Sequence, residues 1–367
     1  MKITKLQLWA VELTSHQTYH MAAGKTCATV TSHVLCLETD TGQRGWGEVC
    51  PIPHYLPAFA GGIPSAVQEM APDILGANPV GVDALMRHLD AQLPGHAAAK
   101  SIVDMALWDL CGQITGLPLC DLLGGRVHDD LPLYHSITCI APDEMARIAH
   151  EAYATGIRQF QVKLGTDQDW QADAERLIKV REAVGNRPLV YGDWNCGASR
   201  LHATRTGRAV AHLDIMLEQP CKTLEDCAAV RSATGLPMKI DEGAHDMASL
   251  LEASRLGCLD AVALKLSKFG GISAMRRARD LSVHLGAVIC AECTWGSDIV
   301  TAAALHFAAT IPKGMLLNTC DLSSYVGPRI AMNAPSRENG RISLPQGAGL
   351  GVVPDFDLLG APVMEMT

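Results

Sequence analysis

The chain has 367 residues, 48% of them hydrophobic, and a formal net charge of −9 at pH 7. This length exceeds that of one simple domain and fits a barrel of roughly 200–250 residues plus an accessory domain. The acidic balance leaves no basic excess to neutralise phosphates, which argues against a nucleic-acid or anionic-membrane partner.

The first 125 residues predict a separate α+β unit. Strands are expected at 3–13 and 30–39. Helices are expected at 64–75, 81–93 and 98–115. A GWGE motif follows the second strand and its turn. The sequence Gly116-Leu117-Pro118 ends the third helix.

From Leu131 onward, short apolar runs alternate with amphipathic helical patterns. The helices are expected at 143–155, 169–184, 199–212, 223–234 and 245–256. Strands that alternate with helices of this length form βα units and a parallel sheet. After Asp321 the alternation fades, and we expect the turn-rich tail to fold back on the first domain.

Five charged residues each end one of the apolar runs. They are Lys163, Asp193, Glu218, Asp241 and Lys265, at successive steps of 30, 25, 23 and 24 residues. Each step matches one strand plus one helix, and the residue just past a strand of a (β/α)₈ barrel faces the active site. Three carboxylates between two lysines therefore predict a divalent-cation site with a base on each side.

The three carboxylates supply the hard oxygen ligands that Mg²⁺ prefers. A single carboxylate at a barrel end more often caps a helix or pairs with an arginine, whereas three on consecutive strand ends favour a metal. A metal here would hold a substrate carboxylate and stabilise the enediolate that forms when the α-proton leaves.

Lys163 and Lys265 are the predicted bases. They lie on either side of the carboxylates in sequence and therefore on opposite walls of the barrel mouth. Desolvation and a nearby dication can bring a lysine pKa from ~10.4 to about 7–8. Lys268 competes with Lys265 because both stand in KLSK. Strand alternation places Lys265 inward and Lys268 outward or on the following loop, so we favour Lys265.

Together these motifs resemble the enolase superfamily, in the muconate-lactonising-enzyme-like subgroup associated with mandelate racemase. GWGE, the stretch 106–125, the barrel motifs and the GLG of the tail match in order over essentially the whole chain. The resemblance implies an α/β fold, a modified (β/α)₈ TIM barrel with an N-terminal α+β capping domain, and an Mg²⁺ cofactor. It places the capping domain at 1–125, a (β/α)₇β-type barrel at 126–330 and a segment returning to the capping domain at 331–367.

One position departs from the pattern of that subgroup, and one absence separates the chain from the acid-sugar dehydratases of the superfamily, which usually carry a histidine near the end of a late barrel strand. The second barrel strand commonly ends Lys-x-Lys, whereas here it reads Gln161-Val162-Lys163. The neutral Gln161 removes one cause of a depressed lysine pKa, yet it can still hydrogen-bond a substrate carboxylate or a metal ligand. The stretch 289–298 holds no histidine, which disfavours racemisation by a His–Asp dyad and favours two-lysine chemistry.

Substrate contacts are expected from the capping loops and the late strand ends. A tyrosine and a tryptophan that converge on a site can hold a cationic nitrogen through their π faces, and Tyr55 and Trp295 are the candidates. Negative charge suited to an amine comes from Glu292, Asp298 and Asp321, although Asp298 can instead cap the helix that begins SDIVTAAA. The full set of expected substrate contacts is Tyr55, Phe59, Gln161, Asn195, Glu292, Cys293, Trp295 and Asp321.

The motifs TYHM, HYLPAFAGG, QVK and TWGSDI are similar to the proline-specific branch of the family. That branch contains hydroxyproline-betaine and proline-betaine 2-epimerases and cis-3-hydroxy-L-proline dehydratases, and the sequence leaves the two outcomes open. A dipeptide epimerase or an o-succinylbenzoate-synthase-like cycloisomerase would use the same five residues. A non-catalytic, metal-stabilised scaffold would not need both lysines.

The expected partner is a small-molecule carboxylate, a cyclic amino acid or betaine, and we expect a homo-oligomer. No run of about 18 apolar residues is present, so no membrane span is expected. The start MKITKLQLWAVEL lacks the apolar core of a signal peptide. Thirteen scattered cysteines, an odd number, fit reduced thiols, and we therefore expect a cytoplasmic enzyme.

Overall fold

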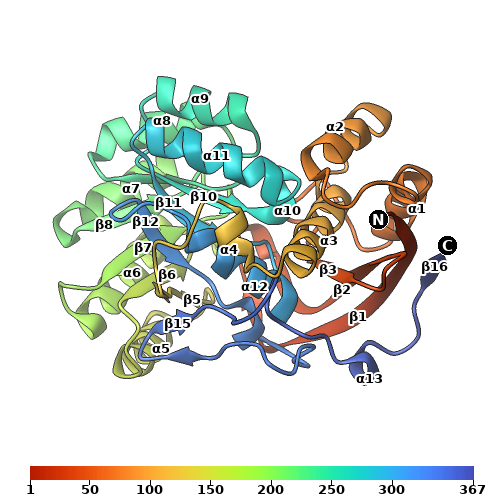
Figure 1. The fold of residues 1–367 in the computed structure, drawn as a ribbon. Helices are drawn as coiled ribbons and strands as arrows, with labels where there is room; N and C mark the ends of the chain where they lie inside the picture. Colours follow the sequence, from red (N-terminus) through yellow and green to blue (C-terminus); the bar gives the residue numbers. More distant parts are fainter.

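Eight parallel strands form the larger part of the computed structural model, which describes residues 1–367 (Figure 1). Their order in the sheet follows the chain: β5 (His135–Ile137), β6 (Gln159–Lys163), β7 (Leu189–Asp193), β8 (Ile215–Glu218), β9 (Met238–Ile240), β10 (Ala261–Lys265), β11 (Val288–Glu292) and β12 (Leu316–Thr319). A parallel bridge between Leu133 and Thr319 joins the two edges of the sheet and closes the barrel.

A helix follows each of the first seven of these strands and covers the outside of the barrel (Figure 1). The helices are α5 (Pro142–Ala154), α6 (Trp170–Val184), α7 (Arg200–Val210), α8 (Leu224–Thr234), α9 (Met247–Arg255), α11 (Ile272–His284), which the short α10 (Leu266–Phe269) precedes, and α12 (Asp298–Ala308). The first five begin and end within two residues of their predicted bounds. Four of these helices are capped at the start by a side-chain oxygen that accepts a backbone N–H of the first turn. The capping residues are Asp169, Ser199, Thr223 and Asp246.

A three-stranded antiparallel meander and three helices form the capping unit beside the barrel. They are β1 (Ile3–His20), β2 (Thr26–Thr39), β3 (Arg44–Val49), α1 (Gly62–Ile74), α2 (Val82–Gln92) and α3 (Ala97–Thr115). The first strand is longer than the predicted 3–13. It continues because Thr14 and Ser15 pair with β13 (Val326–Gly327), and Tyr19 pairs again with β2.

The GWGE motif lets β3 lie directly on α3 and reach the barrel. A Cβ on Gly47 would stand 2.1 Å from the Ile102 carbonyl oxygen, so only glycine permits this approach. Glu48, next along the strand, accepts hydrogen bonds from Ser297 N at 2.7 Å and Val300 N at 2.9 Å. The motif therefore joins the capping unit to the first turn of α12.

A second carboxylate joins the two units at α11. Asp104 on α3 accepts a hydrogen bond from Ser273 N at 3.0 Å, in the first turn of α11. Trp108, one turn further along α3, donates its Nε1–H to Ser273 Oγ at 2.9 Å. Burial raises the pKa of Glu48 to about 7 and that of Asp104 to about 6.

The chain after the barrel returns to the capping unit. β16 (Met364–Met366) pairs antiparallel with β1, and the two lie side by side in Figure 1. The remaining short elements are η1 (Ala22–Gly24), α4 (Leu119–Leu122), β4 (Asp130–Pro132), η2 (Ala211–Leu213), η3 (Leu322–Ser324), β14 (Arg337–Glu338), β15 (Arg341–Ser343) and α13 (Phe356–Leu359). The domain boundaries at 125 and 330 stay predictions.

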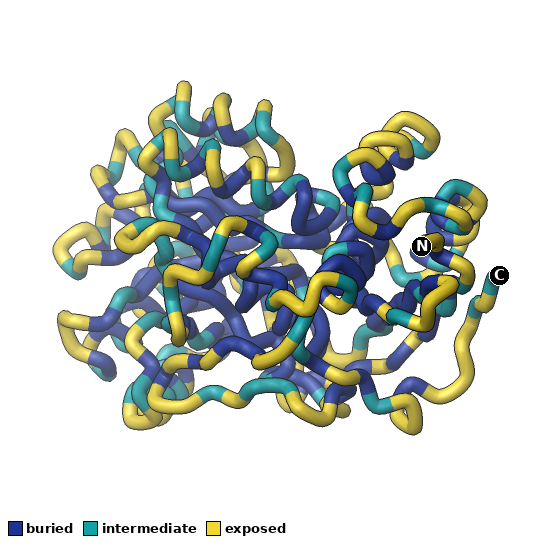
Figure 2. The backbone as a smooth tube through the Cα atoms, viewed as in Figure 1, coloured by how far each residue is buried: buried dark blue, intermediate teal, exposed yellow.

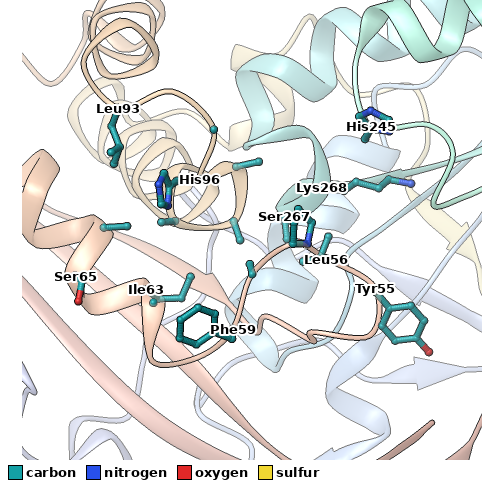
Figure 3. Close-up of a pocket in the computed structure, with 18 of the residues that line it drawn as sticks. Tyr55, Leu56, Phe59, Ile63, Ser65, Leu93, His96, His245, Ser267 and Lys268 are labelled. Atoms are coloured by element: carbon teal, nitrogen blue, oxygen red, sulfur yellow. The ribbon is translucent and has the colours of Figure 1, made fainter. Parts of the chain in front are cut away.

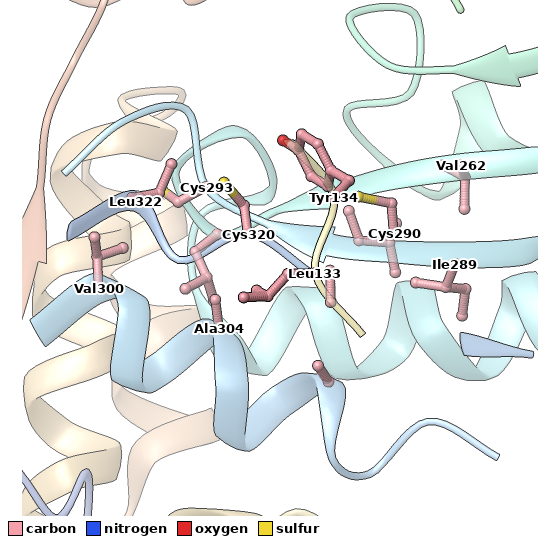
Figure 4. Packing of buried hydrophobic residues seen from close by; sticks show 14 of the residues in the cluster. Leu133, Tyr134, Val262, Ile289, Cys290, Cys293, Val300, Ala304, Cys320 and Leu322 are labelled. Atoms are coloured by element: carbon pink, nitrogen blue, oxygen red, sulfur yellow. The ribbon is translucent and has the colours of Figure 1, made fainter. Parts of the chain in front are cut away.

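Buried residues are concentrated in the barrel strands and continue into the capping unit (Figure 2). Figure 4 shows Val300 and Ala304 of α12 directed toward Cys320, which directly follows β12. None of the helices combines the length and apolar character that crossing a bilayer requires.

Candidate active site

The carboxyl ends of the barrel strands bring the five predicted charged residues to one mouth. Lys163 ends β6 and is in register with Asp193 at the end of β7. Asp193 is in register with Glu218 at the end of β8. Asp241 follows β9 directly, and Lys265 ends β10.

The two predicted bases each hold a candidate metal ligand. Lys163 Nζ donates to Asp193 Oδ2 over 2.5 Å. Lys265 Nζ donates to Asp241 Oδ2 over 2.6 Å. The lysine side chains are only 9% and 12% exposed, so solvent screens these ion pairs weakly.

These ion pairs set the protonation of the lysines. Burial is the largest single influence and lowers the pKa of Lys163, but Asp193, Tyr55 and Glu218 together outweigh it and hold the pKa above the ordinary lysine value. The same balance, with Asp241 as the strongest neighbour, raises the pKa of Lys265 well above that value. Both lysines are therefore ammonium groups at neutral pH in this structure. Either can become a base only when another positive charge compensates its carboxylate.

Lys268 lies inside the site, contrary to the prediction that it points outward or lies on the following loop. It belongs to α10, is buried, and donates to Asp241 Oδ1 at 2.9 Å and to the Ala263 carbonyl oxygen at 3.0 Å. The chain enters a helix directly after Lys265, so strand alternation no longer applies to Lys268. Burial lowers the pKa of Lys268. Asp241 is thus shared by two lysines.

Glu218 has one neutral and one charged partner. Gln161 Nε2 donates to Glu218 Oε2 over 2.8 Å, and Ser136 Oγ in turn donates to Gln161 Oε1 over 2.8 Å. Lys239 Nζ, in the middle of β9, lies 2.9 Å from Glu218 Oε1. Burial raises the pKa of Glu218 to about 7, against the opposing effect of Lys239. Gln161 therefore contacts a candidate metal ligand, one of the two roles that the sequence left open for it.

A cavity of about 40 Å³ lies between Lys163 and Lys265, and both lysines line it. Five of the expected substrate contacts also line this inner cavity: Tyr55, Gln161, Glu292, Cys293 and Trp295. Glu292 is in register with Lys265 and accepts a hydrogen bond from the hydroxyl of Tyr134. The inner cavity thus has an ammonium group on each of two walls.

Aromatic rings form a further wall of the inner cavity. The ring of Tyr19 stands edge-on to Trp295 at 5.4 Å between centroids, and 5.9 Å from the ring of Tyr325. The ring of Tyr55 lies 5.7 Å from Lys265 Nζ. Trp295 Nε1 is buried and has no hydrogen-bond partner in the protein. The wall therefore offers π faces and one free N–H donor.

A larger outer cavity of about 950 Å³ lies between the capping unit and the barrel (Figure 3). Tyr55 lines both cavities, and Figure 3 shows its hydroxyl directed away from Phe59. Phe59 is 62% exposed and lines only the outer cavity, so the structure does not bring it to the two lysines. Glu242 lines the outer cavity beside Lys268.

Asn195 contacts a candidate metal ligand, whereas Asp321 does not. Asn195 donates its backbone N–H to Asp193 Oδ1 at 2.8 Å and its Nδ2 to Asp193 Oδ2 at 3.0 Å. Asp321 accepts a hydrogen bond from Arg337 Nε at 2.7 Å and does not line the inner cavity. The arginine compensates the charge of Asp321, which leaves that carboxylate no free charge to offer an amine.

Two family models account for most of the sequence. Residues 3–124 match the mandelate racemase / muconate lactonizing enzyme N-terminal domain, and residues 144–358 match the enolase C-terminal domain-like model. The chain belongs to the mandelate racemase/muconate lactonizing enzyme family of the enolase superfamily. It is therefore an enzyme, and the predicted family and fold class are confirmed.

Relatives within the family cover nearly the whole chain. A cis-3-hydroxy-L-proline dehydratase of Roseibium aggregatum is 38% identical over 365 residues, 99% of each chain. An N-succinyl-L-Arg/Lys racemase of Bacillus cereus is 30% identical over 318 residues, 84% of each chain. A mandelate racemase/muconate lactonizing enzyme from Roseovarius nubinhibens ISM, solved in complex with magnesium, has a TM-score of 0.95 at 32% identity and 100% coverage of both chains. Racemases, epimerases and dehydratases of the enolase superfamily are thus the activity class of this enzyme.

Sequence reasoning missed several residues of this family member's site. Lys239 stands two residues before Asp241, so strand alternation could have placed both on one face of β9. Glu242 directly follows Asp241, and burial raises its pKa to about 8. Tyr19 lies near the end of β1, beyond the predicted strand 3–13, and Tyr325 lies in the irregular chain after the barrel, so no periodicity marks either residue.

The donor set at the mouth fits a hard divalent cation such as Mg²⁺. Asp193, Glu218 and Asp241 offer carboxylate oxygens from three neighbouring positions, and Glu218 Oε1 and Asn195 Oδ1 are buried without a hydrogen-bond partner. No three acidic, histidine or cysteine side chains converge as a ready-made metal cage. Each of the three carboxylates is instead paired with lysine: Asp193 with Lys163, Glu218 with Lys239, and Asp241 with Lys265 and Lys268.

Proposed function

We propose that this enzyme removes the α-proton of a small carboxylate substrate, a proline derivative, with Mg²⁺ held by Asp193, Glu218 and Asp241. The observation that carries the proposal is the placement of the two lysines. Lys163 and Lys265 come from different strands, line one small cavity and each contact a candidate metal ligand.

When bound, the cation would stabilise negative charge on the substrate carboxylate as the α-proton leaves. The enzyme's own residues carry out the proton transfers and position the substrate. Lys163 and Lys265, once their carboxylates are compensated, are free to take the α-proton at Nζ from either face of the substrate. Glu292 and Tyr134 form the floor of the cavity beside Lys265 and help to hold the ring in place.

The aromatic wall supports a substrate with a cationic ring nitrogen. Tyr19, Trp295 and Tyr325 present π faces, and each such contact with a cation contributes about 0.5–2 kcal/mol. The unpartnered Nε1–H of Trp295 is available to an oxygen of the substrate. Proline and its betaines combine such a nitrogen with a carboxylate in a compact ring.

Two outcomes follow the same proton removal. If Cβ carries a hydroxyl, its C–O bond breaks as the Cα–Cβ double bond forms, and a proton from the opposite lysine leaves with the hydroxide as water. If Cβ carries no leaving group, the opposite lysine returns a proton to Cα and inverts the centre. The relative from Roseibium aggregatum bears the name of the first reaction, cis-3-hydroxy-L-proline dehydration.

Dipeptide epimerisation is the main alternative to a reaction on a proline derivative. The family also includes an L-Ala-D/L-Glu epimerase of Bacillus subtilis, 28% identical over 363 residues. The substrate screen must therefore distinguish dipeptide epimerisation from a reaction on a proline derivative.

The test is a substrate screen in deuterated water with Mg²⁺. The panel holds L-proline, proline betaine, hydroxyproline betaine and cis-3-hydroxy-L-proline, with L-Ala-L-Glu and an N-succinyl amino acid as comparison substrates. Mass spectrometry reads deuterium at Cα even where no net product forms, and loss of water reports dehydration. We expect exchange or dehydration with the proline compounds. Exchange confined to the dipeptide or the N-succinyl amino acid would contradict the proposed substrate class.

A further inference from the structure

Lys239 is a buried lysine at the barrel mouth to which neither the sequence motifs nor the proposed reaction gives a role. It stands in the middle of β9, and its side chain is 0% exposed. Its Nζ lies 2.9 Å from Glu218 Oε1 and 4.0 Å from Glu292 Oε1. A buried ammonium group is costly unless it compensates a specific negative charge.

The surroundings of Lys239 leave it no other position. The rings of Tyr191 and Tyr134 lie over its Nζ at 4.8 and 5.6 Å from their centroids. Unlike Lys163 and Lys265, it does not line the inner cavity. Those two lysines can leave their carboxylates and turn toward a substrate, whereas Lys239 stays where it is.

Lys239 is also the only cation within 4 Å of Glu218. The other partner of Glu218, Gln161, is neutral and contributes a hydrogen bond at 2.8 Å without charge. Despite its short contact with Lys239, Glu218 Oε1 has no well-aligned hydrogen bond. The lysine therefore compensates the carboxylate by charge and leaves its Oε1 lone pairs available.

We propose that Lys239 is a positioning residue, a permanent buried cation that fixes the Glu218 carboxylate and so prepares it to bind Mg²⁺. The inference rests on the proposed metal site and adds a residue outside its ligands. The site contains one more carboxylate than lysine, so it has no spare positive charge. The carboxylates are Asp193, Glu218, Asp241, Glu242 and Glu292, and the lysines are Lys163, Lys239, Lys265 and Lys268. With Lys239 neutralised and no metal bound, Glu218 would be a buried charge without a counter-ion.

The experiment compares Lys239→Met with Lys179→Met in the full-length enzyme. Methionine keeps much of the length of lysine and removes the charge. Lys179 forms an exposed ion pair with Asp143 at 3.0 Å, so its variant also breaks an ion pair, but far from the site. Isothermal titration calorimetry with Mg²⁺ and no substrate measures metal binding directly, and substrate KM and kcat are then measured at saturating Mg²⁺.

We expect the Mg²⁺ Kd to rise about 10–100-fold in Lys239→Met, the range known for residues that orient metal ligands, and to stay unchanged in Lys179→Met. Substrate KM at saturating Mg²⁺ should change less than about threefold, since Lys239 does not touch the substrate. An unchanged or tighter Mg²⁺ Kd in Lys239→Met would overturn the proposal. If the wild-type enzyme binds no Mg²⁺, the proposed metal site itself is wrong, whatever the role of Lys239.

A second comparison tests the proposal in case the Lys239→Met variant does not fold. Lys239→Met/Glu218→Gln removes both charges and leaves no lone buried ion, which is better tolerated than removal of one partner. The proposal expects this double variant to fold and to bind Mg²⁺ as weakly as Glu218→Gln alone. A double variant that fails to fold, or that binds Mg²⁺ a further tenfold more weakly, shows that Lys239 does not act through Glu218.

Discussion

Buried carboxylates occur in two regions of this enzyme, and the two regions compensate them differently. Where the capping unit meets the barrel, Glu48 and Asp104 accept backbone N–H groups from the first turns of α12 and α11, with no lysine or arginine within 4 Å of either. At the barrel mouth, Asp193 and Asp241 each accept a hydrogen bond from a lysine at 2.5 or 2.6 Å. The carboxylates of both regions are buried, so burial alone does not separate a structural carboxylate from a catalytic one.

The difference lies in what the partner can do. A backbone N–H at a helix start is fixed by the helix, so the carboxylate it holds is a permanent joint between the two units. A lysine can turn away when another cation arrives, so the carboxylates at the mouth can exchange an ammonium group for a metal ion. We infer that the same residue type is structural at the first place and reactive at the second.

The largest expected effect comes from removing charge at the mouth. Asp193→Asn, Glu218→Gln and Asp241→Asn keep the side-chain volume and each remove one charged oxygen ligand. Several kcal/mol of charge stabilisation correspond to roughly a 10³–10⁵-fold loss of kcat. Steady-state kinetics with added Mg²⁺ measures this loss, and circular dichroism should show an unchanged fold. Exhaustive chelation should inactivate the wild type, and Mg²⁺ should restore it; turnover that survives chelation would refute the metal role.

The next largest effect separates the two lysines. Lys163→Ala and Lys265→Ala should each lose about 10²–10⁴-fold in net turnover, the usual contribution of a general acid or base. If the reaction is an epimerisation, each variant keeps α-deuterium exchange for one enantiomer through its remaining lysine. If it is a dehydration, the variant without the proton-abstracting lysine loses exchange as well, whereas the other is only slowed.

Lys268→Ala is the control for that assignment. It removes a second partner of Asp241 but no side chain that lines the inner cavity. Exchange should persist in Lys268→Ala, at a higher Mg²⁺ requirement. Full activity of Lys265→Ala together with inactivity of Lys268→Ala would assign the base to Lys268 instead.

The sequence predicted the residues at the barrel mouth better than the contacts between the capping unit and the barrel. Regular strand-plus-helix spacing placed Lys163 and Asp193 correctly at strand ends, because a barrel repeats one geometry. Lys268 was placed wrongly, since the chain becomes helical one residue after β10 and the strand period stops there. The partners of Glu48 could not be predicted at all, because Ser297 is 249 residues away in sequence and no local pattern links them.

A moderate effect on stability is expected at the joint, with a defined pH dependence. Burial raises the pKa of Glu48 to about 7, above the value of about 4.5 in the unfolded chain. A carboxyl with a raised folded-state pKa favours the folded state most at low pH, and this contribution is lost as pH rises through about 7. Glu48→Gln does not titrate, so the stability difference between wild type and variant should shrink by about 1–3 kcal/mol from pH 5 to pH 8. Urea unfolding at these pH values measures it; a difference that is constant or grows with pH would contradict the raised pKa.

The smallest effect is expected from Asp104→Asn, the same isosteric change as Asp193→Asn applied to the joint. Asparagine keeps one carbonyl oxygen to accept the Ser273 N–H, and its amide can donate to Ser273 Oγ, so the first turn of α11 stays capped. The charge-assisted part of the hydrogen bonds is lost, which costs about 1 kcal/mol of unfolding free energy. kcat and KM should stay within about twofold of the wild type, because no group at the barrel mouth moves. A loss of activity comparable to that of Asp193→Asn, with the fold intact, would show that the joint and the mouth are coupled and would end the distinction between fixed and exchangeable carboxylates.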